Sequence, residues 1–515
     1  MANLKDLKSF GQVSWNLILA IIVINISVFS FGFDQSVFST IQAMDGKYNV
    51  IPLCNSYEKR FGTYDSSTQE WVISAEHLSF LNSFGLPAKC LGAVTGLLMA
   101  ERFGRRPSYI AMQFIVIIGI AVSYSAQNFG QALGGRIIVQ CFVGWDNFLA
   151  PMFLAEISPT ALRGGIVVVY VLAHILGSLI CSFVTLRTSS YEGDSSWQIP
   201  LASMFAFPLF VLVFFWLVPE SPRWLVRKGQ NERAIKHLRW LKGSSVSEQD
   251  IITEVGNLHE SLQSDLETKG RWADFLKGPN TRRLGIAIGV AMFNQLTGQS
   301  FMSQYGAIFI KGLKTMNPFT FKVISSAVTC LGPIITFAFV DTVGRRKFYL
   351  TAGTACTAVL LICGGLGTGN VTSGDKTGIL TACVLFGWFY IMSFGAIGAV
   401  TAAEVPHLQL RDKSSMIVYL TQFVCDFVVS YTLPYLLETG YANLHSKVGF
   451  IYGGFGVIGL IWAYFCLPDM SGRSLEELEI MWTEKVPARH FRTWQRKGAD
   501  DNSMSNEIQK GIITV

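Results

Sequence analysis

The sequence has few charged residues for its length. Only 15% of its 515 residues are Asp, Glu, Lys or Arg, whereas 50% are hydrophobic. Soluble domains carry roughly 25% charged residues, so the composition excludes an ordinary soluble protein. The net charge of +6 is also too small for a nucleic-acid surface, and we expect no nucleic-acid partner.

Signatures of enzymes and ATP-driven pumps are missing as well. The chain has no Gly-rich phosphate loop ending in Gly-Lys, which disfavours transport powered directly by ATP. Its 7 histidines and 10 cysteines show no metal-ligand spacing, and the sequence shows no nucleophile–base constellation of the kind that catalysis requires. We therefore expect neither an enzyme nor a cofactor. Only Cys54 falls outside the hydrophobic stretches and their borders, which excludes a disulfide framework.

Long apolar stretches dominate what is present. Each has about 20 residues, enough to cross the hydrocarbon core of a bilayer. The sequence therefore predicts an all-α polytopic membrane protein with twelve transmembrane helices and the lipid bilayer as its surroundings. The first stretch lacks a cleavage site, so we expect a retained helix. The expected spans are 15–37, 73–99, 107–126, 130–154, 164–186, 199–218, 284–310, 320–340, 348–368, 377–402, 413–437 and 447–467.

Three short phrases occur twice in the same order. GLLMAERFGRRP (96–107) returns as AFVDTVGRRKF (338–348), AEISPTALRGG (155–165) as AEVPHLQLRDK (403–413), and PESPR (219–223) as PDMSGR (468–473). The offset between equivalent positions stays near 240 to 249 residues. An internal duplication of this kind is typical of secondary transporters and predicts two pseudo-symmetric halves of six helices.

The chain divides into five expected regions. These are an N-terminal tail (1–14), a first six-helix half (15–223), a polar linker (224–282), a second half (283–467) and a C-terminal tail (468–515). The apolar spacing in the linker predicts short amphipathic helices, which pack under the bundle or bind a partner. Basic residues gather in the loops after the second, fourth, eighth and tenth spans, so we expect both termini in the cytoplasm.

The repeated phrases belong to a wider set of motifs. The chain resembles the sugar porter family of the major facilitator superfamily, and most of all its fungal proton-coupled members, over residues 15–480. The resemblance implies the major facilitator fold and import of a sugar or related polyol across the plasma membrane by alternating access, in symport with a proton. We expect a monomer. The motifs are GFD (32–34), ERFGRR (101–106), PMFLAEISPTALRG (151–164), PESPRWL (219–225), NQLTG (294–298), DTVGRR (341–346) and PDMSGRSLEEL (468–478).

Two charged residues lie at equal expected depth inside the membrane. At 1.5 Å per residue, Asp34 and Arg136 fall about 6–9 Å below the outer boundary, which predicts an ion pair. The resemblance implies that Asp34 is the proton site and Arg136 its partner, whereas a static structural pair is the alternative. Asp146 and Asp426 bind substrate, pair with His174, serve as a second proton site, or are buried structural groups.

The seventh span is rich in amides, which a neutral polyol needs as hydrogen-bond partners. Residues four apart share a helix face, so several amides can line a cavity between the halves; hydrogen bonding between helices is the alternative. The candidate substrate residues of spans 7, 10 and 11 are Asn294, Gln295, Gln299, Ser300, Gln304, Tyr305, Trp388, Gln422 and Asp426.

The chain departs from the family pattern at this site. Val171 and Ser178 stand where the family has a Gln pair, and Ala396 and Ala399 stand where it has Pro and Trp. The loss of a ring and two amides enlarges the expected cavity and makes it less polar. We therefore expect a substrate that is larger than glucose, modified or differently hydroxylated.

Carboxylates and arginines gather at the inner boundary of both halves. Arg can hold a carboxylate through two hydrogen bonds, and the resemblance implies that such pairs latch the outward-facing state. Topology signals with helix capping are the alternative. The members are Glu101, Arg102, Arg105, Arg106, Glu156, Arg163, Glu220 and Arg223 in the first half, and Asp341, Arg345, Arg346, Glu404 and Arg411 in the second.

Two other functions stay open from the sequence. One is a facilitative sugar uniporter of the same fold, and the other is a nutrient sensor that signals through its cytoplasmic segments. The polar segment after residue 468 is short for a signalling tail, which favours the transporter. Asn370 begins an Asn-Val-Thr glycosylation sequon in an expected outer loop.

Overall fold

The computed structural model describes residues 14–42, 44, 56–65, 70–158, 163–191, 193–243, 246–267, 271–313, 315–369, 371–398, 401, 405, 407, 410–437, 441–469, 480–492 and 494. Asn370 and Glu404, and the side chains of Arg163, Asp341 and Arg411, lie outside this description.

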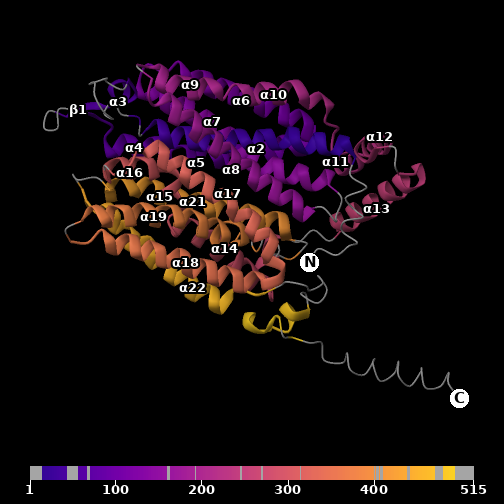
Figure 1. Ribbon diagram of the computed structural model, residues 1–515. Helices are drawn as coiled ribbons and strands as arrows, with labels where there is room; N and C mark the ends of the chain where they lie inside the picture. The colour runs from indigo at the N-terminus through magenta and orange to yellow at the C-terminus, as the bar shows by residue number, and fades with distance from the viewer. Residues whose placement is uncertain are drawn as a thin grey trace.

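The chain forms a bundle of long helices in two halves, as Figure 1 shows in indigo to magenta and in orange to yellow. The all-α architecture in two halves that the sequence predicts is confirmed. The first half contains α2 (Trp15–Ile41), α4 (Ala75–Ser83), α5 (Gly85–Phe103), α6 (Arg105–Tyr124), α7 (Phe129–Ile157), α8 (Arg163–Thr188), α9 (Ser195–Ser203), α10 (Ala206–Phe214) and η2 (Phe215–Leu217).

The second half repeats this arrangement. It contains α14 (Asn280–Leu296), α15 (Gln299–Gln304), α16 (Gly306–Leu313), α17 (Pro318–Val343), α18 (Arg345–Leu366), α19 (Ser373–Tyr390), the π-helix η5 (Ile391–Gly395), α21 (Arg411–Leu437), η7 (His445–Lys447) and α22 (Val448–Cys466).

Eleven helical stretches in the described part of the chain are long and apolar enough to cross a membrane. The twelfth expected span, the seventh in order, is divided into α14, α15 and α16. Gly298 lies at the first break with a positive φ of 87°, and a Cβ there would lie 3.0 Å from the ring of Tyr452. Only glycine adopts this backbone conformation readily, so Gly298, the last residue of the NQLTG motif, permits the break.

The two ends of the bundle differ. The end at the left of Figure 1, here called the hairpin end, carries α3 (Ser56–Phe61) and a short antiparallel hairpin of β1 (Thr63–Asp65) and β2 (Glu70–Val72). This hairpin was not expected from the sequence. The opposite end, here called the linker end, carries α11 (Pro222–Arg227), α12 (Asn231–Lys242), α13 (Glu248–Glu267), η4 (Trp272–Leu276) and η8 (Ala488–His490).

The linker helices pack against the first half. Leu225, Leu238 and Ile251 form a small apolar cluster that joins α11, α12 and α13. Asn16 at the start of α2 donates a hydrogen bond to the carbonyl of Trp240 in α12 at 2.8 Å. These contacts favour packing under the bundle over the alternative of a free partner-binding segment.

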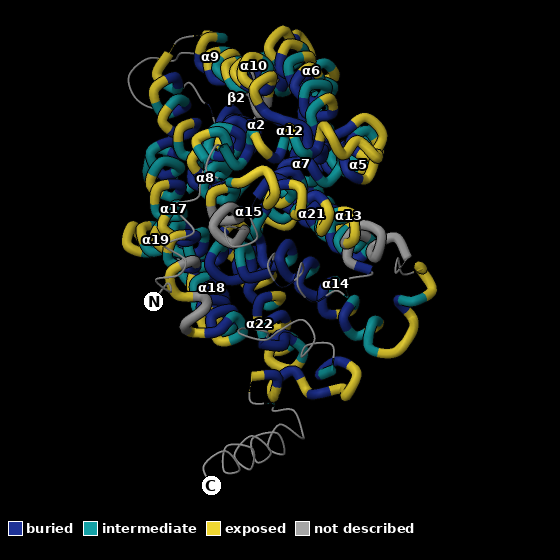
Figure 2. The backbone as a smooth tube through the Cα atoms, turned by 90° about the vertical axis from the view of Figure 1, so that its right-hand side faces the viewer, coloured by how far each residue is buried: buried dark blue, intermediate teal, exposed yellow. Residues whose placement is uncertain are grey.

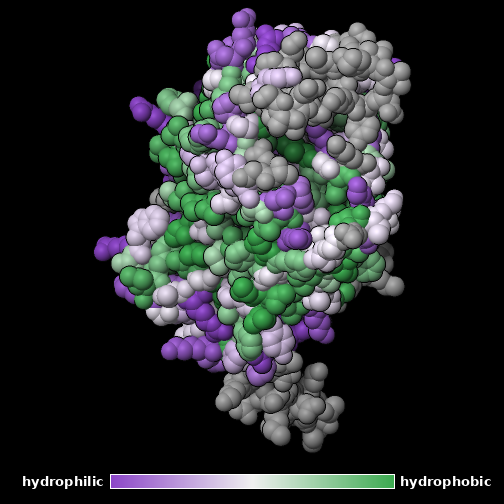
Figure 3. Space-filling view, turned by 90° about the vertical axis from the view of Figure 1, so that its left-hand side faces the viewer, coloured by the Kyte–Doolittle hydropathy of each residue, from purple (hydrophilic) through white to green (hydrophobic). Residues whose placement is uncertain are grey.

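Buried side chains fill each half separately, and apolar side chains cover the outside. One core cluster, with Phe142 and Phe153, lies almost wholly in the first half, and a second, with Phe386, lies in the second half. Figure 2 shows the buried residues on the inner helix faces. Leu98 and Ile458 are 60% and 56% exposed, and Figure 3 shows broad hydrophobic areas on the surface. Such a surface suits lipid contact.

The halves touch each other closely at the hairpin end. The helices that pack across are α2 with α15 and α16, α4 and α5 with α21, and α8 with α17. Ser79 in α4 donates to the carbonyl of Tyr431 in α21 at 3.0 Å, and the hydroxyls of Ser182 and Ser326 lie 3.3 Å apart. At the linker end, α14 packs against α21, α22 and η4 of its own side. The bundle is therefore closed at the hairpin end.

Candidate functional site

Asp34 of α2 and Arg136 of α7 form an ion pair inside the first half. Arg136 Nη1 lies 2.9 Å from Asp34 Oδ1 and 2.7 Å from Oδ2, and Gln140 Nε2 donates to Oδ2 at 3.1 Å. The guanidinium also lies over the ring of Phe38, 3.9 Å from its centroid. Asp34 is 4% exposed. A buried charge pair of this kind is expensive unless it is fully hydrogen-bonded, so a role beyond packing is indicated.

Glycines allow the close helix packing that positions this pair. A Cβ on Gly32 would lie 1.8 Å from the carbonyl oxygen of His174, and one on Gly135 would lie 2.4 Å from Ser123 Oγ. Small residues at helix interfaces let backbones approach closely in membranes. The GFD phrase and the Gly-Arg pair therefore fix α2 against α8, and α7 against α6, at the level of the two charges.

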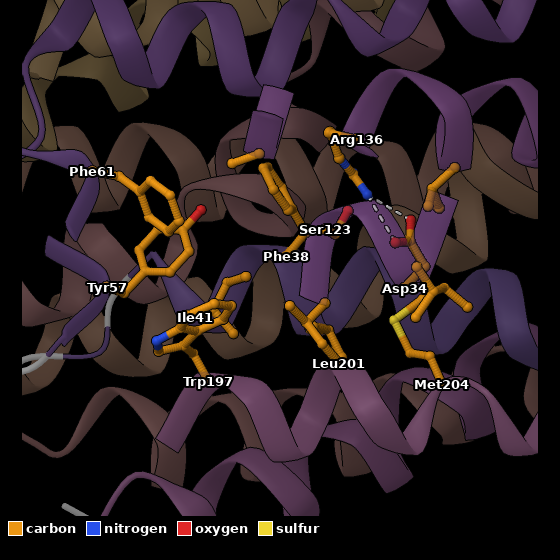
Figure 4. A pocket seen from close by; sticks show the side chains of 14 residues that line it. Asp34, Phe38, Ile41, Tyr57, Phe61, Ser123, Arg136, Trp197, Leu201 and Met204 are labelled. Atoms are coloured by element: carbon orange, nitrogen blue, oxygen red, sulfur yellow. Dashed lines mark hydrogen bonds and ion pairs between the residues drawn. The ribbon is translucent and has the colours of Figure 1, made fainter. Parts of the chain in front are cut away.

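A small cavity adjoins the ion pair within the first half. In Figure 4, Asp34 and Arg136 lie at one end of it, and the aromatic rings of Tyr57, Phe61 and Trp197 lie at the other. Its free space is about 30 Å³, and roughly 10–15 Å³ holds one water molecule on this measure. The cavity therefore has room for about two waters and is far too small for a sugar.

The aromatic end of the cavity is covered by α3, in the segment after α2, and by Trp197 of α9. Tyr57 and Phe61 of α3 contact Trp197 of α9 edge-on, with centroids 5.8 and 6.0 Å apart. Arg60 holds α3 in place through an ion pair to Asp194 at 2.6 Å. Burial raises the pKa of the Tyr57 phenol, so this cover stays uncharged.

A second ion pair joins the two halves. Lys89 Nζ in α5 lies 3.9 Å from Asp426 Oδ2 in α21. Asp426 also accepts hydrogen bonds from Ser300 and, at 3.1 Å, from Ser430. Lys89 was missed by the sequence reasoning, although a lysine in the apolar phrase LPAKCLG is a signal, because charged residues in transmembrane segments are usually functional.

One small polar pocket adjoins the first ion pair and Lys89 of the second. Asp34 and Arg136 line it together with Lys89, and the other polar side chains around it are Gln35, Ser39, Asn82, Gln140 and Gln304. The pocket lies between the proton candidate of the first half and the broken seventh span of the second. It therefore connects the two sets of residues that the sequence singled out separately.

Several amides of the broken span are occupied by bonds within the second half. Asn294 Nδ2 donates to the carbonyl of Phe394 at 2.7 Å, and Asn294 Oδ1 accepts from Gln295 at 3.0 Å and from Gln422 at 3.1 Å. Tyr305 donates its hydroxyl to the carbonyl of Ser430 at 2.9 Å. For Asn294 and Tyr305 this geometry matches the alternative of bonding between helices.

The partner of Asn294 comes from the π-helix η5. In a π-helical turn the backbone carbonyls do not all find the usual partner four residues on, and such turns are frequent at functional sites. The amide of Asn294 satisfies Phe394, and Tyr390 donates to the carbonyl of Asn294 at 2.9 Å. The two broken segments thus brace each other.

Three other polar atoms of the second half lack a protein partner within the described part of the chain. Gln295 Oε1, Gln304 Oε1 and Trp388 Nε1 are buried and have no hydrogen-bond partner among the described residues. Buried polar groups normally have a partner. These three atoms are therefore the strongest candidates for contacts with a polar substrate, and Gln299 and Ser300 lie on the same short helix as Gln304.

Asp146 and His174 are members of neither ion pair. Asp146 Oδ1 accepts hydrogen bonds from Ser27 at 2.8 Å and from Tyr109 at 3.4 Å, all within the first half. The ring of His174 packs against that of Phe31 in a tilted arrangement, with centroids 4.4 Å apart. The described contacts pair neither Asp146 nor Asp426 with this histidine.

At the linker end, Arg105 and Glu156 form a two-bonded pair. Arg105 Nε and Nη2 donate to Glu156 at 2.8 and 2.6 Å. Glu220 accepts the backbone N–H groups of Arg105 and Arg106 at 2.8 and 3.1 Å, and so caps α6. Burial raises the pKa of Glu220, and these backbone donors oppose the rise. Glu101 lies 3.9 Å from Arg227.

The second half repeats the cap in altered form. Asp469 occupies the place of Glu220, since a Cβ on Gly344 would lie 2.7 Å from its Oδ2, and Arg492 lies 3.8 Å from it. Arg346 donates to the carbonyl of Tyr464 at 2.5 Å. The remaining expected members with described side chains are Arg102, Arg223 and Arg345. The described ion pairs at this end lie within one half each.

Comparisons with known proteins agree with this architecture. A sequence model of the family described as "Sugar (and other) transporter" matches residues 19–482. The hexose transporter HXT13 of Saccharomyces cerevisiae is 25% identical over 470 residues, which cover 88% of this chain and 82% of that protein. The high glucose sensor RGT2 of the same yeast is 25% identical, over 93% of this chain and 62% of the sensor.

Solved structures show the same fold. The proton:xylose symporter XylE of E. coli, bound to 6-bromo-6-deoxy-D-glucose, superposes with a TM-score of 0.71 at 21% identity, over 90% of this chain and 99% of that one. Its inward-open form superposes with a TM-score of 0.72.

Proposed function

Because the chain belongs to the sugar (and other) transporter family, it is a membrane carrier rather than an enzyme, and we propose that it imports a sugar or related polyol in symport with a proton. The observation that carries the proposal is the ion pair between Asp34 and Arg136 beside a water-sized cavity. The printed function of XylE, a proton:xylose symporter, supports it.

Asp34 is the proposed proton carrier. A carboxylate beside a guanidinium favours its charged form, whereas a carboxylate in a low-dielectric site without one favours the neutral form. If Arg136 moves away in another conformation, Asp34 takes up a proton there and releases it when the pair forms again. Proton affinity that differs between conformations is what coupling requires.

The proposed substrate site lies between the halves. Gln295, Gln304 and Trp388 supply free buried polar atoms, and Gln299, Ser300, Gln422 and Asp426 stand near them. Asn294 and Tyr305 support the site from behind. Neutral hydrogen-bonding groups suit hydroxyl-rich substrates.

The proposed orientation puts the linker end in the cytoplasm and the hairpin end outside, in the plasma membrane, with both termini cytoplasmic. Arg102, Arg105 and Arg106 at the linker end support it, since basic residues favour the cytoplasmic side. With the hairpin end closed, the described conformation faces inward. We further propose that the arginine–carboxylate clusters bridge the halves when the linker end closes, and that the carrier works as a monomer.

Transport by purified protein in liposomes tests the proposal. An inward proton gradient should drive accumulation, a protonophore should abolish it, and Asp34→Asn should lose accumulation but keep exchange of labelled for unlabelled substrate. Asp34→Glu, the matched control, keeps an ionisable group and should retain protonophore sensitivity. Accumulation by Asp34→Asn that a protonophore does not diminish would contradict the proton role.

A nutrient sensor is the second candidate, because 93% of this chain aligns with the sensor RGT2. A sensor binds its ligand without moving it across the membrane. Exchange of labelled substrate in the same liposomes would exclude it, and binding without exchange would favour it. A facilitative uniporter would exchange substrate but never move protons with it.

A further inference from the structure

Lys89 and Asp426 are each fixed to a different half of the molecule. The backbone of Lys89 is pressed against α7, because a Cβ on Gly144 would lie 1.9 Å from the Lys89 carbonyl oxygen. Asp426 is held by hydroxyls of its own half, Ser300 and Ser430. These bonds use Oδ1 and leave Oδ2 directed to Lys89.

Both charges are largely shielded from solvent. The side chains of Lys89 and Asp426 are 14% and 9% exposed. Leaving one buried charge without its partner is strongly unfavourable, although the pair itself adds little to stability. The pair therefore acts less as a source of overall stability than as a preference for the conformation in which the two charges meet.

The pair lies where the halves are in contact. The helices that carry the pair, α5 and α21, pack across the interface. Ser79 of α4, the helix just before α5, donates to the carbonyl of Tyr431 in α21. Opening of the hairpin end moves the first half away from α21. Such a movement separates Lys89 from Asp426, because the Lys89 backbone is packed against α7 and the Asp426 carboxylate is hydrogen-bonded within its own half.

We propose that Lys89 and Asp426 form a charge clasp that holds the hairpin end closed and must open in each transport cycle. The inference rests on the alternating-access part of the proposed function and is independent of proton coupling. When the clasp opens, the Asp426 carboxylate becomes available to substrate hydroxyls beside Ser300. Asp426 is then a positioning residue in one conformation and a substrate contact in the other.

Distance measurements across the hairpin end test the clasp. Probes are introduced through non-canonical amino acids at Glu76 of α4 and Ser373 of α19, which are both exposed, and the protein is measured in nanodiscs without substrate or gradient. Lys89→Met and Asp426→Asn should each raise the ratio of open to closed hairpin ends roughly fivefold or more, the usual range of such couplings. Lys447→Met, which removes an exposed lysine, should leave the ratio unchanged.

The double variants decide whether the two residues act together. Lys89→Met with Asp426→Asn should shift the ratio no further than the larger single effect, and the charge swap Lys89→Asp with Asp426→Lys should restore the closed population. Unchanged ratios in both single variants, or additive effects in the double, overturn the clasp. If the single variants fail to fold, the swap decides: a folded swap with a closed hairpin end supports the clasp, and a folded swap that stays open overturns it. Because no gradient is applied, a failed proton experiment leaves this result untouched.

Discussion

Gly104 and Glu220 meet so closely at the linker end that any side chain at position 104 would have to displace the Glu220 carboxylate. Gly104 has a φ of +105°, and a Cβ would lie 2.4 Å from Glu220 Oε2. The turn between α5 and α6 thus brings a carboxylate onto the first backbone N–H groups of α6. Anions at a helix N-terminus are favourable because they meet unpaired N–H groups and the positive end of the helix dipole.

Gly104→Ala should therefore destabilise the protein. The new methyl group strains the backbone and displaces Glu220 from the N-terminus of α6, which together should cost about 1–3 kcal/mol. The loss of stability is measured as a lower melting temperature, with the remaining monodisperse protein quantified after heating. Gly134→Ala is the matched control, because that glycine is helical and a Cβ there meets nothing within 4 Å; an equal loss in both variants would contradict the explanation.

The pH dependence of stability should change in Glu220→Gln. Burial raises the pKa of Glu220 above its ordinary 4.5, so its contribution is fully present below pH 4.5 and is lost as pH rises through the higher folded value. Glutamine cannot titrate. Relative to the parent, the melting temperature of Glu220→Gln should hence rise between pH 4.5 and neutral pH and then stay level. A constant difference across that range would show that the carboxyl does not titrate with the expected sign.

Substrate affinity should depend on the unpaired amides. Gln295→Ala and Gln304→Ala each remove a hydrogen bond worth about 1–1.5 kcal/mol, which corresponds to roughly tenfold weaker binding. Titration of purified protein with the best substrate from a panel of hexoses, pentoses, disaccharides, polyols and quinate measures this. Tyr305→Phe, which removes the hydroxyl that donates to the carbonyl of Ser430, should lower the melting temperature and leave affinity within about twofold. Unaffected binding in both alanine variants would move the site elsewhere.

Glu156→Gln should favour the conformation that is open at the linker end. The substitution removes the negative charge that pairs with Arg105. The proposed clusters that bridge the halves when the linker end closes then lose part of their electrostatic attraction. Probes across the linker end should report a smaller closed fraction with no change in folding. Glu254→Gln, which breaks an ion pair to Lys242 within the linker, serves as the control. Equal closed fractions in Glu156→Gln and the parent would leave topology and capping as the roles of this cluster.

Much of the fold was predictable because hydropathy and repetition operate over long stretches of chain. Twelve apolar spans and a duplicated set of phrases were enough for the two halves, and equal depth alone brought Asp34 to Arg136. The break at Gly298 was not expected. A 20-residue hydropathy average does not register one residue with a left-handed backbone.

The details of the site depended on directions that spacing does not encode. Glu220 lies near arginines in sequence, yet it binds backbone N–H groups, because the positive φ of Gly104 turns α6 toward it. Asn294 was expected to face a cavity, but the π-helical turn at Phe394 offers it a nearer carbonyl. Lys89 lies among apolar neighbours that mark it out, but its partner could not be predicted, because it is more than three hundred residues away in the chain.

The small cavity under α3 has room for water molecules but not for a sugar. It lies inside the first half, enclosed by α2, α6, α7 and α9, so a rocking movement of whole halves leaves its walls in place. In the proposed symport, protons would reach Asp34 along one or two water molecules in this cavity, while a substrate as bulky as a hexose would be confined to the interface between the halves. The proton and the substrate of the proposed carrier would thus reach their sites by different routes, one within the first half and one between the halves.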